Sequence, residues 1–113
     1  MKVSEHIHAI KIPFQIQISQ GKIVERFVYV YLIYGEEICL IDSGVTSSEQ
    51  IIFDYIRQTG RNPNEISLII LTHSHPDHIG SALAIKKASG CLVAAHLGVV
   101  PALLHFGATS VSL

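Results

Sequence analysis

Apolar and polar residues alternate along the first part of the chain. Between residues 10 and 18 every second residue is isoleucine or phenylalanine, and lysine, proline and glutamine fill the positions between them. A period of two predicts a β-strand with one buried face. Pro13 places this strand at the edge of a sheet, because proline has no N–H to donate to a neighbour. Residues 27–34 are mostly β-branched or aromatic and predict a central strand.

Short apolar runs and one helical pattern follow. Residues 38–41 predict a third strand and residues 66–71 a fourth. The fourth is apolar at nearly every position, which indicates burial on both faces and a sheet covered on each side. Between these strands a helix is expected to begin near Thr46 or Ser47, because glutamate or glutamine follows each at capping-box spacing, and to end at Gly60.

The alternation continues to the end of the chain. Apolar residues between 79 and 85 predict a second helix with Gly90 as its C-cap, residues 91–95 a fifth strand, and residues 101–106 a short helix. The pattern indicates an α/β layered fold of about five strands with two main helices. At 113 residues the chain is the size of a single domain, which we expect to span residues 1–113.

Composition and charge narrow the possible partners. The chain is 49% hydrophobic and 15% charged, with a net charge of -1, so part of its apolar surface is expected to need a partner. The basic residues are scattered, which argues against nucleic acid. Cys39 and Cys91 lie in apolar runs, which favours reduced thiols and a cytoplasmic location. We find no secretory signal, and the longest apolar stretch is too interrupted for a membrane span.

The strongest chemical signal is residues 72–80, Thr-His-Ser-His-Pro-Asp-His-Ile-Gly, directly after the fourth predicted strand. Four potential metal ligands fall within six consecutive residues: His73, His75, Asp77 and His78. Imidazole and carboxylate groups together suit borderline divalent cations such as zinc. Asp77 alone could equally cap a helix. Packing does not account for the whole cluster, so we interpret it as a metal site.

The spacing of these ligands indicates two adjacent metal ions. In an extended segment His73 and His75 point to the same side, so both can reach one cation. Pro76 disfavours helix for the residue before it, while Asp77 and His78 begin the next helix and project at a different angle, toward a second cation. Such a pair lowers the pKa of a bound water and polarises the carbonyl or phosphoryl oxygen that the water attacks. The cluster therefore indicates hydrolysis.

Through these residues the chain resembles the metallo-β-lactamase superfamily. The resemblance rests on Tyr31-Leu32-Ile33, on Leu40-Ile41-Asp42-Ser43-Gly44 and above all on residues 71–80, which carry the H-x-H-x-D-H motif of the superfamily. It covers residues 28–96. The resemblance implies an αββα sandwich with a metal site at the edge of the sheet.

The resemblance also implies roles for individual residues. His73 and His75 would bind the first metal ion, and Asp77 and His78 the second. Asp77 would also be the catalytic residue that helps to handle the proton of the water. From spacing alone Asp42 is an ordinary turn aspartate, whereas the resemblance places it behind the ligands, where Thr72 also supports the loop. The implied cofactors are two divalent ions, Zn²⁺ first and Fe or Mn as alternatives, and the substrate is a small-molecule ester, thioester, lactone, lactam or phosphodiester.

The second half of the superfamily fold has no counterpart in this sequence. In relatives that half supplies a further histidine, a bridging aspartate and a last histidine, whereas we interpret His96 and His105 here as structural residues. The chain thus resembles an N-terminal half and looks truncated. Three possibilities remain open. One is the metal-dependent hydrolase, and another is a non-catalytic metal-binding fragment that self-associates through its exposed sheet face. In the third, two copies of the chain combine to build a complete site.

Overall fold

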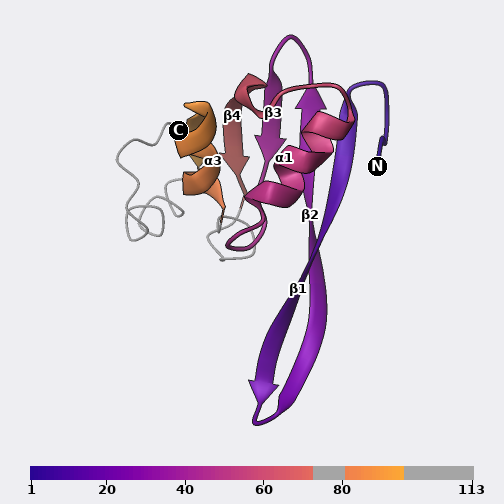
Figure 1. Cartoon of the computed structure of the whole chain (residues 1–113), viewed down its shortest axis with the longest axis vertical. Coiled ribbons are helices and arrows are strands. Elements are labelled where there is room, and N and C mark those ends of the chain that lie inside the picture. The colour runs from indigo at the N-terminus through magenta and orange to yellow at the C-terminus, as the bar shows by residue number, and fades with distance from the viewer. Residues whose placement is uncertain (73–80, 96–113) are drawn as a thin grey trace.

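A five-stranded mixed sheet and two helices make up the described part of the chain (Figure 1). The computed structural model describes residues 1–72 and 81–95. The strands, which lie in sequence order across the sheet, are β1 (Ile7–Ser19), β2 (Lys22–Tyr34), β3 (Ile38–Ile41), β4 (Ile66–Leu71) and β5 (Leu92–Ala95). The helices are α1 (Glu49–Gln58), a 3-10 turn η1 (Pro63–Glu65) and α3 (Ala82–Ser89). β1, β2 and β3 pair antiparallel, whereas β3, β4 and β5 pair parallel.

Most of the predicted elements are confirmed. β3 and β4 have the predicted bounds, β1 is the edge strand that Pro13 indicated, and Gly90 ends α3 in the left-handed conformation with φ 73°. The predicted start of the first helix is wrong, because α1 begins at Glu49 and Ser47 lies at φ 74°, where an α-helix cannot begin. The short helix predicted at residues 101–106 lies outside the described residues. No helix within residues 1–72 and 81–95 is long and apolar enough to cross a membrane.

The core lies between the two helices and one face of the sheet. Leu32, Leu40, Ile69 and Val93 are successive partners across β2 to β5 and are all buried on this face. The helices pack onto them through Ile52, Phe53 and Ile56 of α1 and Ala82 and Ile85 of α3. Each large apolar side chain buried in this way contributes roughly 1.5–3 kcal/mol, so this one layer of contacts accounts for most of the hydrophobic stabilisation.

The opposite face of the sheet carries a second apolar surface. Ile33, Cys39, Leu68 and Leu92 form one row of partners across four strands, and Leu92 is 58% exposed. Tyr31, 41% exposed, begins the neighbouring row. The burial on both faces that we expected for β4 is therefore complete on the helical side only, because no element within residues 1–72 and 81–95 covers the second face.

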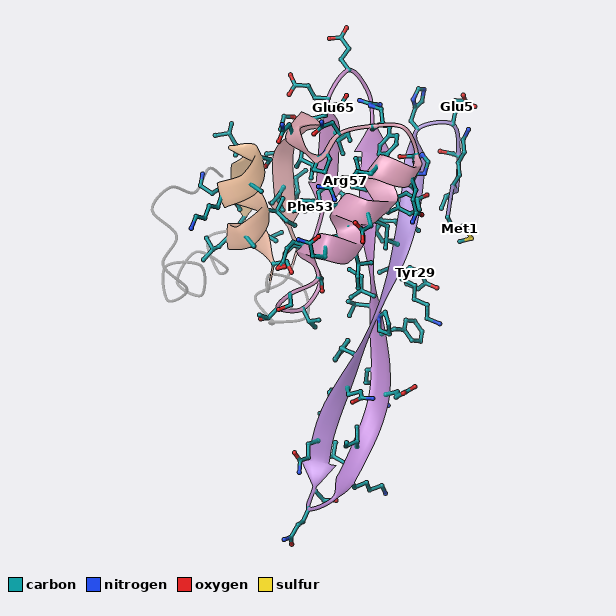
Figure 2. All side chains as sticks on the ribbon, viewed as in Figure 1. Met1, Glu5, Tyr29, Phe53, Arg57 and Glu65 are labelled. Atoms are coloured by element: carbon teal, nitrogen blue, oxygen red, sulfur yellow. The ribbon has the colours of Figure 1, made fainter. Side chains whose placement is uncertain are left out.

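The β1–β2 hairpin reaches beyond the rest of the sheet (Figure 1). Residues 22–30 of β2 pair with β1 alone, because β3 pairs only with the last residues of β2, from Tyr31 to Tyr34. Figure 2 shows side chains on both sides of this projecting part, with Tyr29 where the hairpin leaves the helical layer. The projection points the same way as the carboxyl ends of β3 and β4, where the predicted metal site lies.

The outer edge of β1 is covered only near its start. Ala9 exchanges backbone hydrogen bonds with Met1, N–H to carbonyl in both directions at 2.8 Å, on the side away from β2. Odd-numbered residues of β1 therefore direct their backbone polar groups outward. Pro13 has the same parity, so its missing N–H removes a donor from the open edge rather than from the pairing with β2.

Side chains hold together the other end of the sheet, where β3 and β4 begin. Arg61 donates from Nε to Glu65 at 2.9 Å and from Nη2 to the Gly35 carbonyl at 2.9 Å, which ties the β2–β3 turn to the loop after α1. Beside it the Tyr34 hydroxyl bonds Thr59 Oγ1 at 2.7 Å. Backbone and side-chain hydrogen bonds to the Glu65 carboxylate lower its pKa.

His8 is a buried histidine outside the predicted site. Its Nδ1 shares a hydrogen bond of 2.6 Å with the Tyr55 hydroxyl of α1, and its ring stacks on Tyr34 at 4.3 Å. Burial lowers the pKa of His8 from its ordinary value of 6.5, and the positive charges of the Met1 amine and Lys2 lower this pKa further. His8, Tyr34 and Tyr55 together join β1, β2 and α1, so the neutral His8 imidazole stabilises the fold.

We expect acid to weaken the fold through His8. Because its folded pKa is lowered, the unfolded chain binds this proton at a higher pH than the folded chain, and the free energy of unfolding falls as the pH drops below 6.5. Urea unfolding measured from pH 7 to pH 5 should show a shallower decline for His8→Gln than for the unaltered chain. The exposed His6→Gln variant is the control and should keep the original decline. Equal slopes for all three proteins would contradict this role of His8.

Candidate metal centre

The predicted site begins where two parallel strands end side by side. β3 and β4 are neighbours, and the residues that follow them are Asp42 and Thr72. The Asp42 N–H donates to the Ile70 carbonyl at 2.8 Å, so the pairing of the strands continues one step into the loop. Ligands in sheets of this kind bind beyond the carboxyl ends of the strands. Thr72, the last described residue before the predicted ligands, therefore lies at the end of the sheet where such sites form.

Asp42 and Thr72 are joined by two hydrogen bonds. The Thr72 N–H donates to Asp42 Oδ1 at 2.8 Å, and the Thr72 hydroxyl donates to Asp42 Oδ2 at 2.6 Å. Asp42 is buried, and hydrogen bonds to a charged carboxylate are stronger than neutral ones and offset the cost of burying it. The contact fixes the residue directly before the first histidine of the motif.

The structure thus brings together two of the six predicted site residues. Their role in supporting a metal site stays a prediction. The four predicted ligands, His73, His75, Asp77 and His78, lie outside the described residues, as do His96 and His105. Within residues 1–72 and 81–95 no group of three or more His, Cys, Asp or Glu side chains could hold a metal ion. The described residues Thr72 and Ser81 flank the segment that carries the four predicted ligands.

The β3–α1 loop, residues 42–48, has an unusual backbone. Asp42, Gly44 and Ser47 all lie in the left-handed region, with φ between 62° and 74°. For the non-glycine residues this costs about 1–3 kcal/mol each, which surrounding contacts must offset. A Cβ on Gly44 would lie 2.8 Å from Ile12 Cδ1 and 2.8 Å from Ser48 Oγ, so only glycine fits there. The tight packing fixes the loop against β1 and the start of α1.

Ser81 is a part of this frame that sequence analysis missed. It is fully buried and lies directly before α3, at the N-cap position. A serine there usually accepts a hydrogen bond from its own helix, but Ser81 makes no such bond. Its hydroxyl instead donates to the Val45 carbonyl at 2.7 Å and accepts from the Ser48 N–H at 2.8 Å. The only indication in the sequence was a serine directly before a helix. That position suggests a hydrogen bond to the helix itself, not to Val45 and Ser48.

The residues available fit a divalent metal ion. The segment between Thr72 and Ser81 offers three imidazoles and one carboxylate, a donor set suited to zinc, iron or manganese. Both flanking residues are bonded to the β3–α1 loop. Asp42 is a buried carboxylate of the kind that commonly holds the residues around metal ligands in place.

Comparison with known proteins places these features in a family. The model of the metallo-beta-lactamase superfamily matches residues 23–112. A UPF0173 metal-dependent hydrolase of Shouchella clausii is 34% identical over 95 residues, which are 84% of this chain and 31% of that protein.

Solved structures agree with the family match. Metallo-beta-lactamase SMB-1, solved in a complex with mercaptoacetic acid, is similar with a TM-score of 0.65 at 29% identity, over 76% of this chain and 32% of that one. BJP-1, a subclass B3 metallo-beta-lactamase of Bradyrhizobium japonicum, gives a TM-score of 0.56 at 34% identity, over 59% of this chain and 26% of that one.

The region of similarity is the N-terminal half of the fold. The five-stranded sheet with its two helices matches that half, as the sequence resemblance implied. The chain spans 31% of the Shouchella clausii relative and 8% of a flavoprotein from Nostoc sp. that it matches over 51 residues. The family model covers most of the chain and includes the whole of the H-x-H-x-D-H segment. The chain belongs to the metallo-beta-lactamase superfamily.

Proposed function

We propose that this chain supplies the metal-binding half of the active site of a metal-dependent hydrolase. His73 and His75 would bind one divalent ion, and Asp77 and His78 a second. The observation that carries the proposal is the pair of hydrogen bonds between Asp42 and Thr72, because they fix the start of the ligand segment at the carboxyl edge of two parallel strands.

The residues of the chain would divide the work. Asp42 holds Thr72, which restricts the direction in which the chain enters the ligand segment. Asp77 would accept the proton of the attacking water and pass it to the leaving group. When bound, the divalent ions supply a Lewis acid that lowers the pKa of that water. Zinc suits the histidine-rich donor set best, with iron or manganese as alternatives.

Hydrolysis of a small molecule is the reaction class that we propose. The printed names of two relatives, a metal-dependent hydrolase and a metallo-beta-lactamase, support it. The candidate bonds are those of an ester, thioester, lactone, lactam or phosphodiester. Cys39 and Cys91 are both free thiols, which supports a reducing compartment such as the cytoplasm.

A second candidate function rests on the exposed face of the sheet. Large apolar side chains gather there without a covering layer among the described residues: Tyr29, Tyr31, Ile33 and Leu92. A non-catalytic metal-binding fragment would bury this face by self-association. The two functions differ in catalysis and in mass in solution, so one preparation can separate them.

Removal of the first two ligands should remove the metal. We expect the purified chain to hold up to two divalent ions, and the double variant His73→Ala, His75→Ala to lose at least one of them together with hydrolysis of a generic ester or phosphodiester. Elemental analysis, an activity assay and light scattering on the same samples provide the measurements. His6→Ala, which removes an exposed histidine that contacts the Tyr34 carbonyl, is the control and should retain metal.

The outcomes separate the two candidates. Bound metal with hydrolysis supports the hydrolase. Bound metal without hydrolysis, in a chain that self-associates, supports the fragment. A chain that binds no divalent ion even after incubation with excess Zn²⁺ contradicts both.

The Asp42–Thr72 contact should affect metal affinity more than an equivalent contact elsewhere. Thr72→Val keeps the size of the side chain and removes the hydroxyl bond to Asp42. We expect roughly a 10-fold to 100-fold loss of metal affinity, because the partners that hold metal-binding segments are worth about this much. Competition with a chelator measures the affinity.

Thr59→Val is the matched control for this substitution. It also removes a hydroxyl with hydrogen bonds, to Tyr34 and to the Ile56 carbonyl, at the opposite edge of the sheet. It should lower the free energy of unfolding and leave metal affinity unchanged. An equal effect of both variants on affinity would show that the Asp42–Thr72 contact acts only through general stability.

A further inference from the structure

The Ser81 hydroxyl connects two parts of the chain that are far apart in sequence. It donates to the Val45 carbonyl and accepts from the Ser48 N–H, and these two backbone groups also bond each other at 3.1 Å, so the Ser81 hydroxyl adds two hydrogen bonds to an existing turn of the β3–α1 loop. Ser48 is the N-cap residue of α1 and makes no side-chain cap of its own. The Ser81 oxygen therefore bonds an N–H at the start of α1 while leaving the start of its own helix uncapped.

The other end of the ligand segment is tied to the same loop. Thr72 bonds the Asp42 side chain, and Ser81 bonds the backbone at Val45 and Ser48. The two residues that flank positions 73–80 are thus both held by residues 42–48. Fixing both ends of a segment to one rigid support reduces the number of conformations that the segment can adopt.

A purely structural role for Ser81 would be satisfaction of buried polar groups. The neighbouring Ser48 hydroxyl is buried and has no hydrogen-bond partner among the described residues, so this corner of the core tolerates a buried hydroxyl without one. Ser81, equally buried, makes two bonds, and neither is to α3. The two bonds fix the position of the start of α3 relative to the β3–α1 loop. The ligand segment is followed by α3, so its position depends on where α3 starts.

We propose that Ser81 is a positioning residue of the metal centre, which holds the C-terminal end of residues 73–80 as Asp42 holds the N-terminal end. The proposal rests on the proposed function, because positioning has a chemical effect only if the segment binds metal. In this role Ser81 contacts neither metal nor substrate. Ser81 acts through the β3–α1 loop. Loss of its hydroxyl should change the ligand geometry and the metal affinity of the site in a chain that remains folded.

Two buried serines provide a matched pair of variants. Ser81→Ala removes a hydroxyl with two hydrogen bonds, and Ser48→Ala removes a neighbouring hydroxyl with none. For the unaltered chain and both variants, Co²⁺ affinity is measured by chelator competition, and the visible absorption of bound Co²⁺ reports the ligand geometry. The folded fraction of each protein, from circular dichroism, corrects its apparent affinity.

We expect Ser81→Ala to lose about tenfold or more in corrected Co²⁺ affinity and to show an altered Co²⁺ spectrum. Ser48→Ala should match the unaltered chain in both. If Ser81→Ala does not fold, Ser81→Cys replaces it, since the thiol is somewhat larger than the hydroxyl but fills the site and makes both hydrogen bonds weaker. The same changes, smaller in size, are then expected.

The results distinguish this inference from the proposed function. Unaltered affinity and spectrum in the folded Ser81 variant would overturn the positioning role and leave the metal site intact. Equal losses in Ser48→Ala would also overturn it, because the effect would then be one of general packing. Failure of the unaltered chain to bind Co²⁺ or Zn²⁺ would overturn the proposed function and this inference together.

Discussion

The candidate site depends on the buried Asp42 carboxylate, both of whose oxygens accept hydrogen bonds from Thr72. A carboxylate removed from water is destabilising unless such bonds replace its hydration. In the same loop Asp42 lies at a left-handed φ of 62° and Gly44 packs against Ile12, so the loop contacts both the edge strand and the end of β4. The contact thus joins the ends of two central strands beside the point where the helical layer begins.

Local patterns predicted the elements well where local forces decide them. Period-two alternation located β1, and the apolar runs gave β3 and β4 with their bounds, because burial of one face or both leaves a direct trace in sequence. The start of α1 was wrong for a tertiary reason. Thr46 and Ser47 have capping-box partners, but in the folded loop Ser47 lies in the left-handed region, and the helix begins two residues later at Glu49. Strand order and the parallel pairing of β3 with β4 depend on long-range contacts that no local pattern contains.

In the candidate site, too, some residues could be predicted from local sequence and others could not. Its ligands are adjacent in sequence, so their chemistry could be predicted from spacing alone, although the structure describes none of them. Asp42 gave no local signal beyond that of a turn aspartate, and only the resemblance to a family connected it with Thr72, 30 residues away. Ser81 gave a misleading signal, since a serine before a helix indicates a cap for that helix. Its actual partners, Val45 and Ser48, become neighbours only when two strand-to-helix connections lie side by side.

The position of Pro13 affects how this protein behaves in a crowded solution. The outward N–H groups of a long edge strand are a template on which other chains can add as further strands and grow into fibrils. Met1 occupies the first part of that edge by pairing with Ala9, and beyond it Pro13 interrupts the row of donors near the middle of β1. An incoming strand would meet a gap where a ladder of hydrogen bonds must be continuous. Pro13 therefore shortens the stretch of the hairpin's open edge along which a further strand could pair without interruption.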